Sequence, residues 1–275
     1  MLNVSKNIEA ALRHHYGEIA EICAGVGVEF LAVGATARDL VLHYGHGAPI
    51  KRATKDIDVA VLIADWGVFN ELQEALVASG YRKSNTAQRF FSRSDIPVDV
   101  VPFGAVADAS SSILWPPAGE TSMSVLGFSE AHQHADIVRI QESPDIDIRV
   151  ATPVGLALLK LIAWQDRSPD VRLKDAVDLR YLFDYYERIP EVSDTLYSDA
   201  ALGERHSWDT QLMAAELLGK RVREISGTDA AGVLQALIGD RQILETLVLE
   251  MSDWKEHAIE RSATLLDAFL VGYDQ

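Results

Sequence analysis

Two aspartates, Asp56 and Asp58, lie two residues apart at the start of a short apolar segment. This segment, DIDVAVLI at residues 56–63, is rich in β-branched residues and alternates in polarity, which predicts a strand. Alternate residues of a strand point to the same face, so the two carboxylates share one face and the apolar residues take the other. Two neighbouring carboxylates repel each other unless a cation offsets their charge, and Mg²⁺ accepts such hard oxygen ligands. Taken alone, the motif also fits solvated acids at a strand end.

A third aspartate, Asp99, lies within another apolar segment, PVDVVPF at residues 97–103. A carboxylate among valines is costly without a partner, so we expect it to serve a function. If the strands 56–63 and 97–103 are neighbours in one sheet, three acids come together. Three carboxylates can hold two metal ions about 3.5 to 4 Å apart, which suits in-line nucleotidyl transfer. We therefore predict a site for Mg²⁺ or Mn²⁺ at Asp56, Asp58 and Asp99, with Asp99 as general base or second-metal ligand.

A glycine turn precedes these acids. Gly34 and Ala35 join a predicted strand at residues 30–33 to a helix that starts at Thr36. Glycine lets the backbone approach a phosphate, and a helix N-terminus offers free N–H groups with a partial positive charge. The Asp-x-Asp strand follows about 20 residues later, which favours a phosphate-binding turn for a nucleotide.

Together these motifs resemble the nucleotidyltransferase superfamily that includes DNA polymerase β. Its members carry a Gly-Gly or Gly-Ser turn on a helix, an Asp-x-Asp or Asp-x-Glu strand and a third acid on a later strand. The segment VGATARDL, residues 33–40, also resembles the GGxxRD turn of tRNA nucleotidyltransferases. Ala35 stands where the second Gly or Ser is usual, so a serine contact to phosphate is lost while backbone N–H contacts remain. The resemblance implies that Gly34, Ala35, Thr36 and Arg38 bind the nucleotide.

A later pair of segments narrows the resemblance. TPVGLALLKL at 152–161 is followed by Asp166-Arg167 and then by KDAVDL at 174–179. This resembles the bacterial AbiEii-type nucleotidyltransferases, toxins of type IV toxin–antitoxin and abortive-infection systems, and implies nucleotide-binding roles for Lys160, Lys174 and Asp175. The resemblance covers residues 30–185, whereas residues 190–275 match no pattern that assigns them a role.

The same residues also allow simpler interpretations. Lys160 is one cation on a nearly wholly apolar helix and can extend along the helix surface to water. Lys174 and Asp175 can face solvent at the start of a helix. Asp178 lies on the same helix side as Asp175, and Arg180 can neutralise it.

The elements that position these residues predict an α/β (α+β) protein. We expect a nucleotidyltransferase-fold catalytic domain with a mixed sheet at residues 1–150, followed by an all-helical C-terminal domain at 151–275. Strands are predicted at 30–33, 56–63, 88–93, 97–103, 136–141 and 146–151, and helices at 5–24 and 66–78, the latter capped by Asp65. Residues 45–55 read as a loop and 104–135 as an irregular insertion. In the second domain, helices are predicted from Pro153, at 173–188 with Pro190 closing it, and at 208–273 with breaks near Gly227 and Gly239.

Composition and charge limit the possible functions. The chain has 275 residues, of which 48% are hydrophobic and 24% charged, so it can form a sizeable core. Its single cysteine, the lack of a long apolar run and a charged N-terminal segment favour a cytoplasmic protein without a membrane partner. A net charge of -16 disfavours non-specific nucleic-acid binding. Cations gather locally, as solvated loops or as a polyanion site, at Lys51, Arg52, Lys55, Arg82, Lys83, Arg89 and Arg93.

We therefore expect an enzyme that transfers a nucleoside monophosphate from an NTP to an acceptor. The acceptor can be RNA, such as the 3′ end of tRNA, or a protein or a small molecule, and a toxin would have a cognate antitoxin. Two alternatives remain. Ala35 favours a non-catalytic nucleotide-binding regulatory protein with a degraded site, and the same acids would also serve an antibiotic nucleotidyltransferase.

Overall fold

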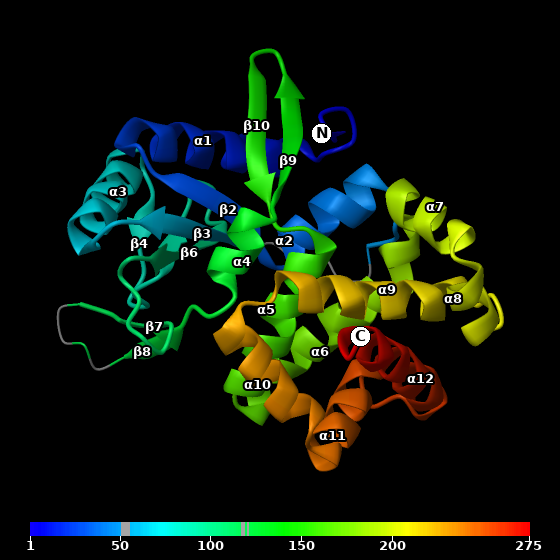
Figure 1. Ribbon diagram of the computed structural model, residues 1–275. Coiled ribbons are helices and arrows are strands. Elements are labelled where there is room, and N and C mark those ends of the chain that lie inside the picture. The colour runs from blue at the N-terminus through cyan, green and yellow to red at the C-terminus, as the bar shows by residue number, and fades with distance from the viewer. Residues whose placement is uncertain (51–55, 117–118, 120) are drawn as a thin grey trace. The chain divides into compact units, whose positions relative to one another are not determined.

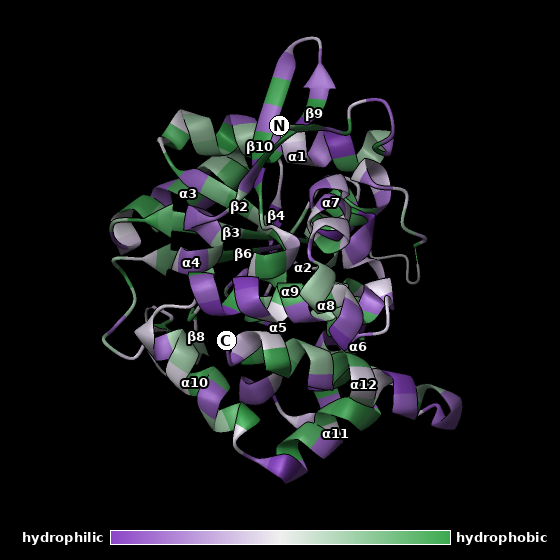
Figure 2. Cartoon of the chain, turned by 45° about the vertical axis from the view of Figure 1, so that its right-hand side comes forward, coloured by the Kyte–Doolittle hydropathy of each residue, from purple (hydrophilic) through white to green (hydrophobic). Residues whose placement is uncertain are grey.

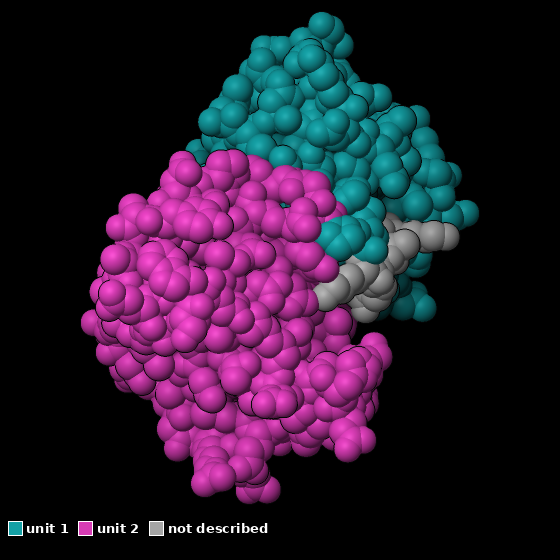
Figure 3. Space-filling view, turned by 90° about the vertical axis from the view of Figure 1, so that its right-hand side faces the viewer, with its two compact units in different colours: residues 1–45, 49–152 teal, residues 46–48, 153–275 magenta. Residues whose placement is uncertain are grey.

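The computed structural model describes residues 1–50, 56–116, 119 and 121–275, which form two compact units (Figures 1 and 3). Unit 1 comprises Met1–Gly45 and Pro49–Thr152, and unit 2 comprises His46–Ala48 and Pro153–Gln275. A mixed sheet and many helices confirm the predicted mixed α/β class. The second half of the predicted loop 45–55, with its cations Lys51, Arg52 and Lys55, lies outside the described residues.

Within the described residues, unit 1 is built on an eight-stranded mixed sheet with the order β1-β9-β10-β2-β3-β6-β5-β4. Its central strand β3 runs antiparallel to β2 and parallel to β6, so the predicted strands 56–63 and 97–103 are neighbours as expected. The strands of this sheet are β1 (Leu2–Asn3), β2 (Glu29–Val33), β3 (Ile57–Ile63), β4 (Arg82–Lys83), β5 (Arg89–Phe91), β6 (Pro97–Gly104), β9 (Asp136–Glu142) and β10 (Asp145–Val150).

The alternating apolar residues of β3 are buried, as its sequence predicts. Its odd-numbered residues are all buried, and they are Ile57, Val59, Val61 and Ile63. Figure 2 shows the corresponding apolar colouring along β3 and β6. The hydrophobic effect thus fixes this face of β3 toward the core and leaves Asp58 on the opposite one.

Two helices of unit 1 start or end where their sequence signals predict. In α1 (Ala10–Val26), which starts later than residue 5, the left-handed Gly27 (φ 75°) ends the helix. In α3 (Trp66–Ala78), the Asp65 side chain accepts hydrogen bonds from the backbone N–H groups of Gly67 and Val68, at 2.7 and 3.1 Å. Helices α1 and α3 pack against each other and onto the sheet at β2 and β3.

The predicted irregular insertion at 104–135 contains regular structure. It holds the antiparallel strands β7 (Ser112–Leu114) and β8 (Ser122–Ser124) and the short helix α4 (Phe128–Gln133). Three-residue strands are too short to give a periodic signal, which is why the sequence does not reveal them. Just after β7, the ring of Trp115 packs on those of Trp66 and Phe69, with centroids 5.7 and 5.8 Å apart. This aromatic cluster fixes the insertion to α3.

Unit 2 is helical throughout its described secondary structure. Its α-helices are α5 (Pro153–Asp166), α6 (Pro169–Tyr185), α7 (Pro190–Ser198), α8 (Ala200–Arg205), α9 (Thr210–Ile225), α10 (Thr228–Ile238), α11 (Arg241–Met251) and α12 (Glu256–Tyr273). The predicted breaks near Gly227 and Gly239 are confirmed, and a further break separates α11 from α12. Pro190 does more than close the preceding helix, because proline fits the first turn of a helix and here begins α7. In this part of the chain no helix combines the length and apolar character needed to cross a bilayer.

Helices α9 and α12 pack with their backbones in contact. A Cβ atom at Gly219 would lie 1.9 Å from the carbonyl oxygen of Phe269, and one at Gly272 would lie 1.8 Å from that of Glu216. Only glycine allows such an approach. The two glycines therefore set the closest distance between these helices.

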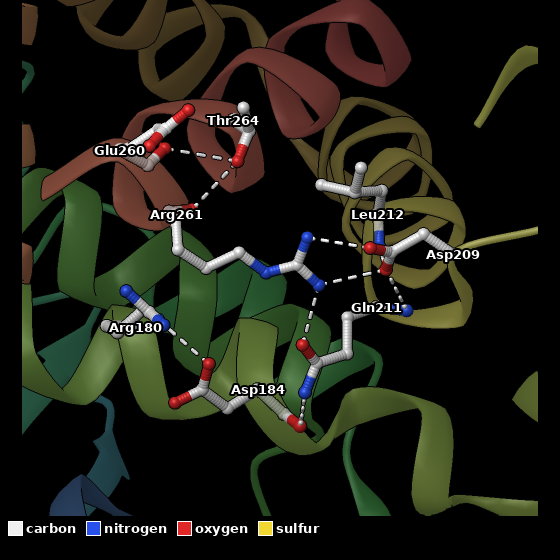
Figure 4. A network of polar contacts seen from close by, with 8 residues as sticks. All are labelled: Arg180, Asp184, Asp209, Gln211, Leu212, Glu260, Arg261 and Thr264. Carbon is white, nitrogen blue, oxygen red and sulfur yellow. Dashed lines mark hydrogen bonds and ion pairs between the residues drawn. The ribbon is translucent and has the colours of Figure 1, made fainter. Parts of the chain in front are cut away.

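A polar network joins the N-terminal ends of the same helices (Figure 4). Arg261 of α12 binds the Asp209 carboxylate at 2.7 and 2.9 Å, and Gln211 at 2.7 Å. Asp209 in turn caps α9 through the N–H groups of Gln211 and Leu212, and Gln211 donates to the carbonyl of Asp184 at 3.1 Å. The hydrogen bonds from Arg261 lower the pKa of Asp209. The Arg261–Asp209 pair thus joins α12 to the start of α9, and the Gln211 amide joins α9 to α6.

Candidate active site

Asp58 of β3 and Asp99 of β6 are register partners in the parallel strand pair. Neighbouring strands lie about 4.8 Å apart, and paired residues point to the same face, so the two carboxylates lie side by side. Asp99 is largely buried, with 17% of its side chain exposed. Asp56 directly precedes β3 and is about half exposed. The structure therefore brings Asp58 and Asp99 together, with Asp56 at the entrance to the same strand.

Gly34 lies on the other side of Asp58. The preceding residue, Val33, is the cross-strand partner of Asp58 in the β2–β3 pair. Gly34 starts the short helix α2 (Gly34–Arg38) with a φ of 71°, and a Cβ atom there would lie 2.2 Å from Oδ2 of Asp58. The backbone of the turn therefore approaches the Asp58 carboxylate at a distance that only glycine permits. Ala35 follows and is buried.

The side chains of Thr36 and Arg38 are engaged inside unit 1. Thr36 shares a buried hydrogen bond of 2.8 Å with the hydroxyl of Tyr16, whose pKa is raised by burial. Arg38 is 4% exposed and donates from Nε and Nη2 to Oδ1 of Asp39, at 2.9 and 2.8 Å. These contacts anchor α2, which continues as a π-helix over Asp39–Gly45, beside the acids. The nucleotide-binding roles of Thr36 and Arg38 stay predictions.

Arg89, which the sequence places only among the clustered cations, belongs to this site. It lies on β5, opposite Asp99 in the antiparallel β5–β6 pair. Its Nε and Nη2 groups donate to Oδ1 and Oδ2 of Asp99 at 2.8 and 2.7 Å, and Nη2 lies 3.9 Å from Oδ2 of Asp56. The hydrogen bonds with Asp99 raise the pKa of Arg89, although partial burial opposes this. One guanidinium therefore offsets part of the charge of all three predicted acids, and most of all that of Asp99.

In unit 2, Lys160 lies between two buried carboxylates. Its ammonium group on α5 is 2.9 Å from Asp175 and 2.8 Å from Asp178, both on α6. Burial lowers the pKa of Lys160, but the charges of Asp178 and Asp175 more than compensate, and the net effect is a raised pKa. The alternative of a lysine that extends to solvent is therefore wrong. Arg167 binds the second oxygen of Asp175 at 2.6 Å.

Two further expectations for α6 need correction. Arg180 binds Asp184, four residues later, at 2.8 Å and does not neutralise Asp178. Lys174 is exposed as the simpler interpretation predicts, but Asp175 is only 1% exposed at its side chain. The two neighbours therefore point into different surroundings, because adjacent helical residues lie about 100° apart around the axis.

The sequence matches the family described as nucleotidyl transferase AbiEii toxin, type IV TA system, over residues 29–258. The chain belongs to the AbiEii family. It is therefore a nucleotidyltransferase, in agreement with the side-by-side aspartates and the glycine turn. None of the curated proteins compared with this sequence matches it.

Two solved structures are similar to this AbiEii family member at low identity. The antibiotic-resistance factor ANT(2'')-Ia is 14% identical, with a TM-score of 0.39, and the match covers 73% of this chain and 98% of that one. The CCA-adding enzyme of Thermotoga maritima, solved in complex with tRNA, is 10% identical, with a TM-score of 0.29 and coverage of 99% and 85%. Both TM-scores are below 0.5, so neither similarity bears on the substrate of this chain.

The predicted metal ligands fit a hard divalent cation by their chemistry. Within the residues that the structure describes, no group of three or more His, Cys, Asp or Glu side chains is arranged to hold a metal ion. Asp58 and Asp99 nevertheless offer paired oxygen donors, and a cationic group, the Arg89 guanidinium, already binds Asp99 and approaches Asp56. Carboxylate oxygens are the ligands that Mg²⁺ and Mn²⁺ favour.

Proposed function

We propose that this AbiEii family nucleotidyltransferase uses Asp56, Asp58 and Asp99 to hold Mg²⁺ or Mn²⁺ and transfers a nucleoside monophosphate from an NTP. The observation that carries this proposal is the position of Asp58, which has Asp99 beside it on one strand and the Gly34 backbone against it on the other. When bound, the metal would neutralise charge on the triphosphate.

The residues of unit 1 have separate roles in this proposal. The backbone at Gly34, Ala35 and Thr36 contacts triphosphate oxygens, since a turn without a side chain at its first position can approach them closely. Asp99 accepts the proton of the acceptor hydroxyl as its oxygen attacks the α-phosphorus, and pyrophosphate leaves. Arg38 holds the helix that follows the turn through its bond to Asp39.

We propose that Lys160 and Lys174 contribute to nucleotide binding as well, with Asp175 positioning Lys160. The pair of carboxylates around Lys160 supports this role, because they keep the ammonium group charged and fixed in position. A fixed ammonium group contacts phosphate oxygens as a point charge. Lys174 is exposed and so is accessible to a ligand.

We propose that the protein acts as a toxin with a cognate antitoxin, as its family does, and that RNA is its acceptor, for example the 3′ end of tRNA. Two other outcomes have distinct consequences. Transfer to an aminoglycoside would indicate an antibiotic nucleotidyltransferase. Nucleotide binding without any transfer would indicate a regulatory protein whose site is degraded at Ala35.

The test is transfer of label from each of four α-labelled NTPs, with Mg²⁺, Mn²⁺ or chelator. The acceptors are purified tRNA, total cell protein and a panel of aminoglycosides. We expect labelled tRNA with the wild-type protein and none with Asp58→Asn or Asp99→Asn. Asp95→Asn is the matched control, because Asp95 is a largely exposed acid of the same unit with a φ of 60°, which asparagine tolerates. Equal labelling by Asp58→Asn and Asp95→Asn would contradict the assignment.

A further inference from the structure

A cavity of about 170 Å³ in unit 1 is lined in part by Arg89, which binds Asp99. It lies between α3, the β4–β5 segment and the residues Trp115 and Pro116, which follow β7. Its lining includes the side chains of Phe69, Asn70, Gln73, Lys83, Arg89 and Trp115. The predicted roles of the catalytic acids do not account for this cavity.

Two aromatic rings form one part of its wall. Phe69 and Trp115 are 1% and 5% exposed, and their ring centroids are 5.8 Å apart. The Nε1 donor of Trp115 is buried and finds no acceptor among the described residues. Because both side chains line the cavity, they give it an apolar wall against which a base can pack.

A cation, Lys83, and two amides, Gln73 and Asn70, form another part of the cavity wall. Lys83 donates to Oε1 of Gln73 at 2.8 Å, and no described carboxylate lies within 4.0 Å of its ammonium group. Its ammonium group is therefore held in place by an amide, and no acid among the described residues pairs with it. Asn70 of α3 is exposed and also lines the cavity. Ammonium groups bind phosphate, and amides can pair with the polar edge of a base.

Arg89 connects the cavity to the catalytic acids. The same side chain lines the cavity and binds both oxygens of Asp99. A ligand in the cavity and the carboxylate of Asp99 therefore share one guanidinium. Because Asp99 is the proposed base for the acceptor hydroxyl, the cavity lies on the acceptor side of the reaction.

We propose that this cavity binds the acceptor nucleotide, with its base against Phe69 and Trp115 and its phosphate at Lys83. This inference rests on the proposed function, which it deepens by naming the residues that select the acceptor. The ligand is a nucleoside monophosphate unit, either free or at the end of an RNA strand. Lys83 and Arg89 make the cavity unfavourable for a polycationic aminoglycoside, because like charges repel.

The experiment measures binding by titration calorimetry without NTP and with chelator, so that the metal and triphosphate sites make no contribution. The probes are AMP, CMP, GMP and UMP, inorganic phosphate, kanamycin and a short RNA with a free 3′ hydroxyl. Lys83→Gln removes the phosphate contact from an exposed position, so it should fold. Trp115→Phe keeps an aromatic wall but removes the indole. Lys6→Gln is the matched control, an exposed lysine of the same unit outside the cavity.

We expect at least one mononucleotide to bind more tightly than phosphate, and Lys83→Gln to weaken it about 10-fold or more, since contacts to charged groups contribute strongly. Trp115→Phe should weaken mononucleotide binding more than the control Lys6→Gln does. Thermal melting checks that each variant folds. Tighter binding of the RNA than of any free nucleotide would identify a strand end as the source. The reverse order would identify a free nucleotide.

Three results would overturn the inference. They are equal binding by wild type and Lys83→Gln, equal binding of phosphate and mononucleotides, and binding of kanamycin alone. None of these depends on NTP incorporation, so labelled tRNA with an unaffected Lys83→Gln variant would reject the cavity and keep the proposed function. Loss of NTP incorporation together with intact, Lys83-dependent mononucleotide binding would reject the proposed function and keep the cavity.

Discussion

The backbone of Gly34 lies against the carboxylate of Asp58 so closely that a side chain has no room. A Cβ atom at Gly34 would be 2.2 Å from Oδ2 and 2.8 Å from Cγ of Asp58. The φ of 71° at Gly34 is also a conformation that other residues adopt only with strain. Turn and acid therefore depend on each other, so the first position of the turn requires glycine, whereas the next residue, Ala35, carries a side chain that is buried.

Gly34→Ala should abolish nucleotidyl transfer, because the new methyl group must displace Asp58 or the turn. The backbone strain alone should cost about 1 kcal/mol of stability. Gly27→Ala is the matched control, since Gly27 has a φ of 75° and its added Cβ would meet nothing within 4 Å. It should lose similar stability and keep activity. NTP incorporation and thermal melting of both variants test this, and an active Gly34→Ala would contradict it.

Arg89 and a divalent cation compete for Asp99, because the guanidinium binds both oxygens and adds a positive charge beside Asp56. Arg89→Gln should therefore bind Mn²⁺ about 10-fold more tightly than the wild type, a change of roughly 1.4 kcal/mol. Electron paramagnetic resonance of free Mn²⁺ measures this without any turnover. Arg82→Gln, which changes an exposed arginine paired with Asp95, should leave the affinity unchanged. Weaker binding by Arg89→Gln would show that Arg89 supports the metal site.

The sequence predicts well where long periodic patterns determine the structure. Strand β3 and helix α3 follow from alternation and from the Asp65 cap, whereas the sequence left open whether β6 lies beside β3, and the structure shows that it does. The register that places Asp58 beside Asp99 comes from the structure. Once the two strands pair, burial of their apolar faces leaves little choice of register.

The contacts of Arg89 and Lys160 cannot be predicted from such patterns, for a common reason. The Arg89–Asp99 pair depends on the register of the three-residue strand β5, and the contact of Lys160 with Asp178 depends on how α5 packs on α6. Neither is a local property of the sequence. For Asp178, the nearby Arg180 suggested a partner, but four-residue spacing favours its pairing with Asp184.

Lys160→Met should destabilise unit 2, because it leaves Asp178 and Asp175 with less compensation in a buried site. Removing one partner of such a pair costs about 3 to 5 kcal/mol. The double variant Lys160→Met, Asp178→Leu should recover part of this loss, since it removes the uncompensated charge as well. Urea unfolding of the single and double variants measures the coupling. A Lys160→Met variant as stable as the wild type would show that Lys160 does not stabilise the unit.

The pH dependence of stability should change in the same variant. The pKa of Lys160 is raised in the folded protein above its ordinary value of 10.5. Its contribution is therefore fully present below that value and is lost as the pH rises through the folded-state pKa. The melting temperature of the wild type should fall more steeply above about pH 10.5 than that of Lys160→Met. Parallel curves for the two proteins at alkaline pH would contradict this.

Gly219 and Gly272 should be the least replaceable residues of unit 2, because a methyl group at either would overlap a carbonyl oxygen of the facing helix. Gly219→Ala should force α9 and α12 apart. It should lower the free energy of unfolding by about 1 to 3 kcal/mol or more, as overpacking of a core does. Gly232→Ala is the matched control, since Gly232 lies within α10 and an added Cβ would meet nothing within 4 Å. There alanine should stabilise the protein by about 0.5 to 1 kcal/mol through its higher helix propensity. Denaturant unfolding of the two variants should therefore give changes of opposite sign, and a Gly219→Ala variant as stable as Gly232→Ala would rule out the close backbone contact.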